Sequence, residues 1–328
     1  MPVVAVVFGL GLLTVGAELV VRGGSRLATL AGVSPLAVGL TIVAVGTSAP
    51  ELAIGIDSAR QGVGDLALGN IAGTNIVNTL FVLGLVAFMS ALPLHPRVPR
   101  IDLPVMVGSA ALLLLMSLDR HLGVVDGIVL LAGGVAYTVG VVRTSRRDDP
   151  ALGAEFEELL EGPEHERAPQ PRSSAVLGKQ VTIVIAGLAL IVVGADRLVS
   201  GAVSIATSLG VSDAFVGLTV VAIGTSAPEL VTAVVASVRG ERDIAVGNLF
   251  GSSVYNVLII LGITIIASPG GLDVPSDLLR FDLPVMLAVS ILCIPVFLTG
   301  HKVSRREGAM FLSLYAVYLG VVLWMELA

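Results

Sequence analysis

The sequence GLTIVAVGTSAPEL at residues 39–52 occurs a second time, as GLTVVAIGTSAPEL at residues 217–230. Each copy lies in a long apolar segment, and each interrupts that segment with the same six residues, GTSAPE. A proline removes a backbone donor from a helix, and a glycine loosens the preceding turn. The pattern therefore predicts two half-helices that meet at membrane depth, with a Thr-Ser pair capping the second half. The residues of the break are Gly46, Thr47, Ser48 and Pro50 in the first copy and Gly224, Thr225, Ser226 and Pro228 in the second.

A glutamate follows each break at once, Glu51 in the first copy and Glu229 in the second. An acidic residue at the centre of a membrane helix costs about 2.5–3.5 kcal/mol, so such residues are functional candidates by default. A structural clamp is the alternative, but a clamp would not need the same hydroxyls and the same break twice. The end of the first half-helix, near Ala44 and Val45, should also present unpaired carbonyls. Ligands that are all oxygen favour hard cations such as Ca²⁺, Na⁺ or Mg²⁺.

The composition indicates the class of protein. Hydrophobic residues make up 55% of the 328 residues, charged residues make up 13%, and the mean hydropathy is +0.96. Soluble domains carry about 25% charged residues, so an integral membrane protein is expected. The single cysteine, Cys293, excludes an intrachain disulfide, and the four histidines all lie in polar connections. The sequence has no basic face with interleaved aromatic residues, so nucleic-acid binding is not indicated.

Ten apolar segments are each long enough to cross about 30 Å of hydrocarbon. They span residues 3–30, 35–60, 65–90, 101–118, 123–142, 175–208, 213–238, 243–267, 280–299 and 306–326. Nearly half of the positions in 39–84 are identical to those in 217–262. Because five is odd, a second set of five helices must enter the membrane from the opposite side. We therefore predict an all-α integral membrane protein with ten transmembrane helices in two inverted five-helix repeats, helices 2 and 7 being broken. The halves are 1–143 and 175–328, joined by an acidic linker at 144–174.

Basic residues predict the orientation. With the N-terminus outside, fifteen Lys and Arg residues lie on the inner side and four lie on the outer side. Basic residues concentrate on the cytoplasmic side of membrane proteins. Both termini are therefore expected outside the plasma (inner) membrane of a prokaryote, with the 144–174 linker in the cytoplasm. That linker is short and rich in proline and charge, which favours a solvated connection over a folded calcium sensor.

The segments GNIAGTNIVN (69–78) and GNLFGSSVYN (247–256) follow the two breaks. With GTSAPE they resemble the two α-repeats of the calcium/cation antiporter superfamily, and most closely its prokaryotic sodium/calcium exchangers. The resemblance implies that Thr74 and Asn78, one turn apart, and likewise Ser252 and Asn256, complete the ion site. The predicted metal ligands are Glu51, Glu229, Thr47, Ser48, Thr225, Ser226, Thr74, Asn78, Ser252 and Asn256, with the carbonyls of Ala44 and Ala222.

Neighbouring residues in these segments have other expected roles. Small-xxx-small faces, which let helices approach closely, are formed by Gly69 and Gly73 and by Gly247 and Gly251. Asn70 and Asn248 fit two roles equally well, as ion ligands or as partners for backbone freed by the breaks. Asn75 and Ser253 lie beside the ligand face and are less expected as ligands.

The remaining membrane acids have simpler interpretations. Glu18 and Asp196 stand in the matching segments GAELVVRGG and GADRLVSGA, each with an arginine within one turn. An ion pair or interfacial anchor is favoured for both. By resemblance to the family, in which these long tilted helices move against the others, a gating role is the alternative. N-caps are predicted at Asp65, Asp102, Asp243 and Asp282, which all stand at the start of an apolar segment.

Several branches of the family place an aspartate where this chain has Asn78 or Asn256. The predicted site therefore holds two carboxylates, which balance one Ca²⁺ or two Na⁺. A third Na⁺ would have to bind at hydroxyl, carbonyl and amide oxygens.

The function predicted from these features is secondary antiport of Ca²⁺ against Na⁺ by alternating access at a central two-glutamate site. A Ca²⁺/H⁺ exchanger of the same fold is one alternative, because a desolvated glutamate can also bind a proton. A cation channel is the other. An enzyme is not expected, since neither HExxH nor GxSxG occurs. No cofactor is expected; the partners are Ca²⁺, Na⁺ and the lipid bilayer, with no nucleic acid and no obligate protein partner.

Overall fold

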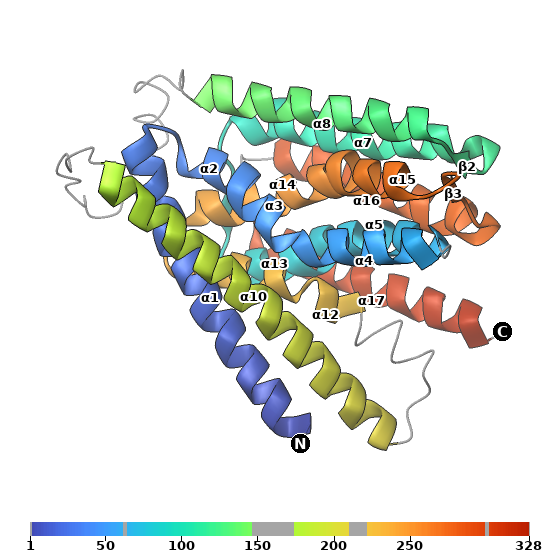
Figure 1. The fold of residues 1–328 in the computed structure, drawn as a ribbon, viewed down its shortest axis with the longest axis horizontal. Helices are drawn as coiled ribbons and strands as arrows, with labels where there is room; N and C mark the ends of the chain where they lie inside the picture. Colours follow the sequence, from blue (N-terminus) through green and yellow to red (C-terminus); the bar gives the residue numbers. More distant parts are fainter. Residues whose placement is uncertain (1, 62–63, 146–173, 210–221, 299–301, 328) are drawn as a thin grey trace.

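The computed structural model describes residues 2–61, 64–145, 174–209, 222–298 and 302–327 (Figure 1). The described chain is a helical bundle with two very short strand pairs. Its longer helices are α1 (Pro2–Ala31), α4 (Ala49–Gln61), α5 (Gly64–Ile76), α7 (Leu103–Met116), α8 (Val124–Ser145), α10 (Ser174–Ser208), α13 (Ala227–Val238), α14 (Arg242–Tyr255), α16 (Leu283–Leu298) and α17 (Arg305–Leu327). The shorter α-helices are α2 (Pro35–Val38), α3 (Ala44–Thr47), α6 (Leu83–Met89), α12 (Ala222–Thr225) and α15 (Gly262–Ala267).

Wider, π-helical turns interrupt several of these helices. They are η1 (Gly39–Val43), η2 (Val77–Val82), η3 (Val98–Asp102), η6 (Asn256–Leu261) and η7 (Leu278–Asp282), and a 3₁₀ turn, η4 (Ser117–Asp119), follows α7. Such turns are frequent at functional sites. Two of them, η2 and η6, occupy equivalent places in the two copies of the repeated sequence.

Eight helices of the described part are long and apolar enough to cross a membrane. They are Pro2–Ala31, Leu66–Met89, Val98–Asp119, Val124–Ser145, Val176–Ser208, Arg242–Ala267, Leu278–Leu298 and Arg305–Met325. A ninth span results if Pro35–Thr47 and Ala49–Gln61, which meet at a bend of 42°, count as one. The protein is thus a multi-pass helical membrane protein. The predicted seventh span begins in residues that lie outside the described ranges, and α12 and α13 form its remainder.

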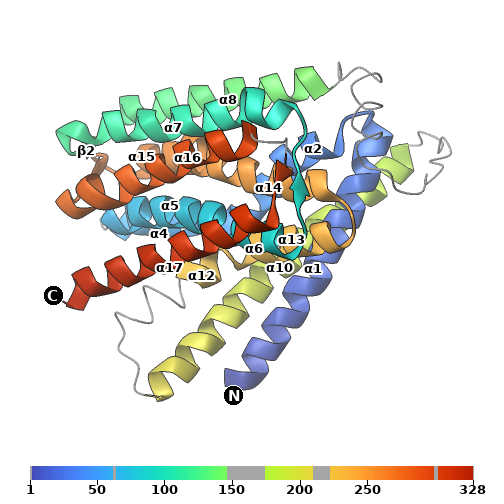
Figure 2. The ribbon, with the colours of Figure 1, turned by 180° about the vertical axis from the view of Figure 1, so that it is seen from behind.

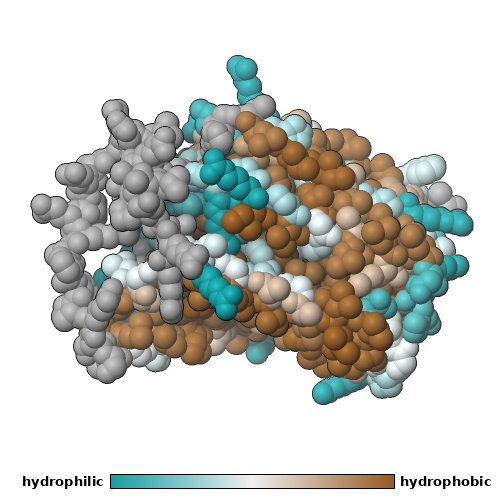
Figure 3. Space-filling model, turned by 90° about the horizontal axis from the view of Figure 1, so that it is seen from above, coloured by the Kyte–Doolittle hydropathy of each residue, from teal (hydrophilic) through white to brown (hydrophobic). Residues whose placement is uncertain are grey.

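Two of these spans form the centre of the bundle. The apolar windows of Leu66–Met89 and Arg242–Ala267 are 78% and 83% buried, whereas those of the other six spans are 17–39% buried. The outer helices expose apolar side chains, and Figure 3 shows hydrophobic residues over the middle of one face with hydrophilic residues toward its right-hand end. The two central spans contain the GN segments, so the predicted ligands lie where lipid and water are excluded.

Two antiparallel strand pairs cross-link the loops. β1 (Leu92–Pro93) pairs with β4 (Lys302–Val303), and β2 (His121–Leu122) pairs with β3 (Leu272–Asp273). β1 precedes α7 and β2 follows it, so the two pairs lie at opposite ends of that helix. Each pair joins a loop of the first half of the chain to a loop of the second half.

The helices α1 and α10 lie side by side and cross the bundle obliquely (Figures 1 and 2). They are antiparallel, since Gly9 meets Gly194 and Gly16 meets Gly187. A Cβ placed on Gly16 would lie 2.6 Å from the Gly187 carbonyl oxygen, and one on Gly187 would lie 2.8 Å from the Gly16 carbonyl oxygen. The glycines recur every seven residues on both helices. They form a ladder along which the two backbones touch.

Ion pairs join α1 to the turn between α13 and α14. Arg239 donates from Nε to Glu18 Oε2 at 2.9 Å, and Arg22 also contacts the Glu18 carboxylate. One turn further along α1, Ser25 Oγ donates to Glu241 Oε1 at 2.8 Å. Asp196 on α10 lies 3.8 Å from Arg197. The ion-pair interpretation of Glu18 and Asp196 is confirmed, and Arg239 is a partner that the sequence did not predict.

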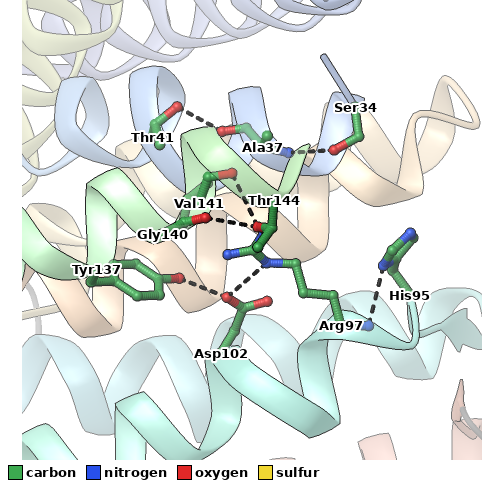
Figure 4. Close-up of polar contacts among 10 residues, drawn as sticks. All are labelled: Ser34, Ala37, Thr41, His95, Arg97, Asp102, Tyr137, Gly140, Val141 and Thr144. Carbon is green, nitrogen blue, oxygen red and sulfur yellow. Dashed lines mark hydrogen bonds and ion pairs between the residues drawn. The ribbon is translucent and has the colours of Figure 1, made fainter. Parts of the chain in front are cut away.

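The predicted N-cap at Asp102 is wrong. This residue ends η3 in a helical conformation and makes no capping bond, because the helix already begins at Val98. Its carboxylate instead accepts from Arg97 Nε (3.3 Å) and from the Tyr137 hydroxyl (3.0 Å), and Arg97 also donates to Thr144 (Figure 4). The Asp102 carboxylate is therefore buried and bound by the Arg97 and Tyr137 side chains, and it caps no helix.

The caps at Asp243 and Asp282 are wrong for related reasons. The N-cap of α14 is Glu241, which leaves Asp243 inside the first turn. Asp282 ends η7 and accepts from the Tyr318 hydroxyl at 3.0 Å. The side chain of Asp65 lies outside what the structure describes.

The small-residue face of α14 is confirmed. A Cβ on Gly247 would lie 2.6 Å from the Leu36 carbonyl oxygen, and one on Gly251 would lie 2.6 Å from the Ala44 Cβ. These contacts bring α14 against η1 and α3, next to the bend. Gly69 and Gly73 have no such backbone contact in the described ranges, and the equivalent partner segment falls mostly in 210–221, outside them.

Candidate ion-binding site

The helix break at Ser48, between α3 and α4, is a sharp bend at which two backbone hydrogen bonds are kept. Ser48 has φ −81° and ψ 9°, and its N–H donates to the Ala44 carbonyl at 3.0 Å. Leu52 N–H in turn donates to the Ser48 carbonyl at 3.2 Å. Pro50 has no N–H to contribute, which weakens the helix at this point. The result is a 42° change of direction between Pro35–Thr47 and Ala49–Gln61.

The second copy has the same local geometry. Ser226, between α12 and α13, has φ −84° and ψ 4°, and Leu230 N–H donates to its carbonyl at 3.0 Å. Its side chain makes no capping hydrogen bond. The predicted capping by Ser226 is therefore wrong, and its hydroxyl has no partner among the described residues. The Ser48 hydroxyl donates to Glu229, a residue of another helix.

Four polar side chains surround Glu229, which is fully buried. The hydroxyls of Ser48 and Ser252 each donate to Glu229 Oε1 at 3.3 Å. Thr47 Oγ1 donates to Asn248 Oδ1 at 3.0 Å, and Asn248 Nδ2 lies 3.5 Å from the Glu229 carbonyl. Residues from both copies of the repeated sequence thus meet at one carboxylate. Asn248 serves the scaffold here, the second of its two predicted roles.

The Ala44 carbonyl is not unpaired, contrary to the prediction. It accepts the Ser48 N–H (3.0 Å), the Thr47 hydroxyl (3.2 Å) and the Ser252 hydroxyl (3.4 Å). The reason is that the Ser48 N–H keeps its helical bond to this carbonyl and two hydroxyls also reach it. Its oxygen still lies within this polar cluster. Ala222 begins α12, and its role as a ligand stays a prediction.

Glu51 is the equivalent residue in the first copy. It is fully buried, interacts electrostatically with Glu229, and has the Thr74 hydroxyl as a neighbour. Within the described ranges, neither Glu51 oxygen has a hydrogen-bond partner. The same is true of the Thr74 hydroxyl and of both amide atoms of Asn78, which are 3% and 1% exposed.

Seven buried side-chain oxygens of the predicted ligands have no hydrogen-bond partner among the described residues. They are Glu51 Oε1 and Oε2, Glu229 Oε2, Thr74 Oγ1, Asn78 Oδ1, Ser226 Oγ and Asn256 Oδ1. A buried polar atom left unpaired costs about 1–3 kcal/mol, and more when it is charged. No Lys or Arg in the described part pairs with either glutamate. The donor set is oxygen-rich and acidic, which suits hard cations.

Most of the predicted ligands are buried. Thr47, Ser48, Glu51, Thr74, Asn78, Ser226, Glu229, Ser252 and Asn256 are all 3% exposed or less, and Thr225 is 8% exposed. Asn75, expected beside the ligand face, accepts a hydrogen bond from Asn256. Thr232 was not predicted from the sequence; it is fully buried one turn after Glu229, and its hydroxyl has no partner among the described residues. Ile54 holds the position equivalent to Thr232 in the first copy, so the repeat gave no signal for it.

The fold and this cluster define a multi-pass helical membrane protein with a buried, oxygen-lined acidic site. The family model for the sodium/calcium exchanger protein matches residues 1–143 and 179–324. The inner membrane protein YrbG of Escherichia coli is 33% identical over 323 residues, covering 98% of this chain and 96% of its own. The sodium/calcium exchanger MaX1 of Methanosarcina acetivorans is 30% identical over 342 residues, covering 96% and 97%. A solved structure of the sodium-calcium exchanger NCX_Mj, soaked with Na⁺ and Sr²⁺, superposes with a TM-score of 0.80 at 27% identity over 97% of both chains.

The chain therefore belongs to the sodium/calcium exchanger family, a family of transmembrane ion antiporters. The resemblance predicted from the GTSAPE and GN segments is confirmed. This is a family of transporters and not of catalytic enzymes.

Proposed function

We propose that this protein exchanges Ca²⁺ for Na⁺ across the membrane, by alternating access at one site formed by Glu51 and Glu229. The observation that carries the proposal is that seven buried oxygens of the predicted ligands, three of them on these two carboxylates, have no hydrogen-bond partner among the described residues. Two negative charges in a site without a cationic partner are neutralised by one Ca²⁺ or by two Na⁺. Because the bare carboxylates cannot easily be carried through a low-dielectric barrier, the site reorients only when an ion is bound, and exchange follows.

The proposed architecture is ten spans in two inverted five-helix repeats with helices 2 and 7 broken. The matching geometry at Ser48 and Ser226 supports equivalent breaks. The strand pairs support the inversion, because β1 and β3 occupy equivalent positions in the two halves and belong to pairs at opposite ends of α7. An operation that exchanges the halves would thus also exchange the two membrane faces. The halves are 1–143 and 175–328.

The location proposed is the plasma membrane of a prokaryotic cell, with both termini outside and the 144–174 linker inside. Support comes from the distribution of basic residues, fifteen on the inner side against four. We expect a reporter inserted at 150–170 to be active in the cytoplasm and reporters at both termini to be external. The measurement is a pair of fusions active only on one side of the membrane. Termini on opposite faces would require an odd number of spans and would contradict the inverted repeats.

Sodium is the coupling ion in this proposal. Two relatives that the chain resembles over nearly their full length carry the name sodium/calcium exchanger. In proteoliposomes, an outward Na⁺ gradient should drive Ca²⁺ uptake. A pH gradient that drives uptake with no Na⁺ present would assign H⁺ as the coupling ion instead. Uptake that needs neither gradient would indicate a channel.

We expect the exchange to move net charge. Two Na⁺ already balance the two carboxylates, so a third must bind at neutral oxygens, such as those of Thr74, Asn78 and Asn256, and it adds one positive charge to each cycle. Exchange current in proteoliposomes should then follow the membrane voltage, because one charge moved through the full potential corresponds to about 2.3 kcal/mol per 100 mV. An exchange rate that does not depend on voltage, with two Na⁺ transported per Ca²⁺, would contradict binding of a third Na⁺. It would leave the proposal of a two-glutamate site unaffected.

A further inference from the structure

A buried pair of amides lies beside the two glutamates. Asn75, on α5, is 6% exposed, and Asn256, at the junction of α14 and η6, is fully buried. Asn256 Nδ2 donates to Asn75 Oδ1 at 3.2 Å. Asn75 Nδ2 donates to the Ser253 carbonyl at 3.1 Å and lies 3.6 Å from the Met286 sulfur. The amide pair therefore connects α5 to α14 and α16.

The partners fix which end of each amide points where. A backbone carbonyl and a thioether sulfur only accept hydrogen bonds, so the Asn75 atom facing Ser253 and Met286 must be the nitrogen. The Asn75 oxygen is then the atom that faces Asn256. An oxygen accepts, so Asn256 must present its nitrogen to Asn75. The oxygen of Asn256 is consequently turned away from Asn75.

The freed oxygen lies on the ion-site face of α14. Ser252, one turn before Asn256 on this helix, donates to Glu229 Oε1 at 3.3 Å. Asn256 Oδ1 is buried and has no partner among the described residues. If the amide were reversed, its NH₂ would point into the site and repel a cation.

We infer that Asn75 is a positioning residue: it holds the Asn256 side chain so that its oxygen, and not its NH₂, faces the transported ion. This inference rests on the proposed function of the site and extends it to a residue outside the ligand set. It also explains how an uncharged amide at position 256 serves as a ligand. Its orientation is fixed before an ion arrives, so no binding energy goes into ordering it.

The other half of the site lacks this device. The position equivalent to Asn75 is Ser253, whose hydroxyl donates to the Leu249 carbonyl of its own helix at 3.0 Å. Asn78, the equivalent of Asn256, has no partner on either amide atom in the described part of the chain. Only one of the two amides is oriented by a neighbour, so the two halves should contribute unequally to binding.

The test compares three variants: Asn75→Leu, Asn256→Ala and the double variant. Leucine keeps the branched shape of Asn75, is somewhat larger, and removes its hydrogen bonds. We expect Asn75→Leu to raise the Ca²⁺ concentration for half-maximal exchange about tenfold, the effect of one lost ligand interaction, with the maximal rate changed by less than about threefold. Asn256→Ala should do the same. The double variant should be no worse than either single one, because Asn75 acts through Asn256.

Two measurements separate this role from a structural one. Stabilisation of the purified protein by Ca²⁺, read as a shift in melting temperature, reports binding without transport. Ser253→Ala, at the equivalent position, is the matched control and should bind Ca²⁺ like the wild type. Effects of the two single variants that add in the double variant, or an Asn75→Leu protein with wild-type Ca²⁺ dependence, would overturn the inference alone. If Ca²⁺ neither stabilised the wild-type protein nor was transported by it, both the proposed function and this inference would be overturned.

Discussion

Glu51→Gln and Glu229→Gln are each expected to abolish calcium exchange while the protein still inserts and folds. Glutamine keeps the size of the side chain and its hydrogen bonding but removes one of only two negative charges that offset Ca²⁺. Losing one member of a buried charge pair costs about 2–5 kcal/mol or more, so exchange should fall by at least about 30-fold. The measurement is Na⁺-driven Ca²⁺ uptake into proteoliposomes, with melting temperature recorded for each variant.

The control for this experiment lies on the same helix as Glu51. Asp57→Asn makes the same change from acid to amide at an exposed position of α4, and exchange should stay close to that of the wild type. Replacing a hydroxyl removes only a neutral ligand. Alanine at Thr47, Ser48, Thr225 or Ser226 should therefore weaken Ca²⁺ affinity by about tenfold or less. Near-normal transport by either glutamine variant would favour the structural clamp instead.

The candidate site could be predicted in large part because its chemistry is local and duplicated. Pro50 and the hydroxyls before it predict a helix break with polar side chains wherever they occur in an apolar segment, and the second copy repeats them. The spacing of Thr74 and Asn78 follows from one helical turn. What the repeat could not predict is asymmetry, and both Asn75 and Thr232 have a different residue at the equivalent position.

The wrong predictions concern backbone continuity and tertiary partners. Ala44 was expected to have a free carbonyl because Gly46 and Pro50 predict a helix break at this point, yet the Ser48 N–H still donates to that carbonyl. Asp102 resembled an N-cap in the sequence, but its environment is set by Arg97 and Tyr137, and Tyr137 lies 35 residues away. No local pattern reports such a distant partner.

The glycine ladder between α1 and α10 has a signal in the sequence, although it was not among the predictions. Gly9 and Gly16 are seven residues apart, as are Gly187 and Gly194. A seven-residue repeat keeps small side chains on one seam of a helix, where they let two backbones touch.

The second large effect is therefore expected from Gly16→Leu, compared with Gly11→Leu on the same helix. A Cβ at Gly16 already lies 2.6 Å from the Gly187 carbonyl oxygen and 2.9 Å from the Ile191 backbone nitrogen. Contacts under 3 Å with backbone cannot be relieved by a rotamer change, so α1 and α10 must separate. Overpacking of this kind costs about 1–3 kcal/mol and occasionally more. We expect a melting temperature lower by several degrees and exchange below about a tenth of the wild-type rate.

Gly11 supplies the opposite expectation. It lies five residues from Gly16, faces away from α10, and no described atom comes within 4 Å of its Cβ position. Leucine is a better helix former than glycine by several tenths of a kcal/mol, and its side chain is favourable in contact with lipid. Gly11→Leu should therefore be neutral or slightly stabilising. The identical substitution thus separates helix–helix contact from helix propensity. If both variants lost stability and transport equally, the close approach of α1 and α10 would not be what holds these two helices together.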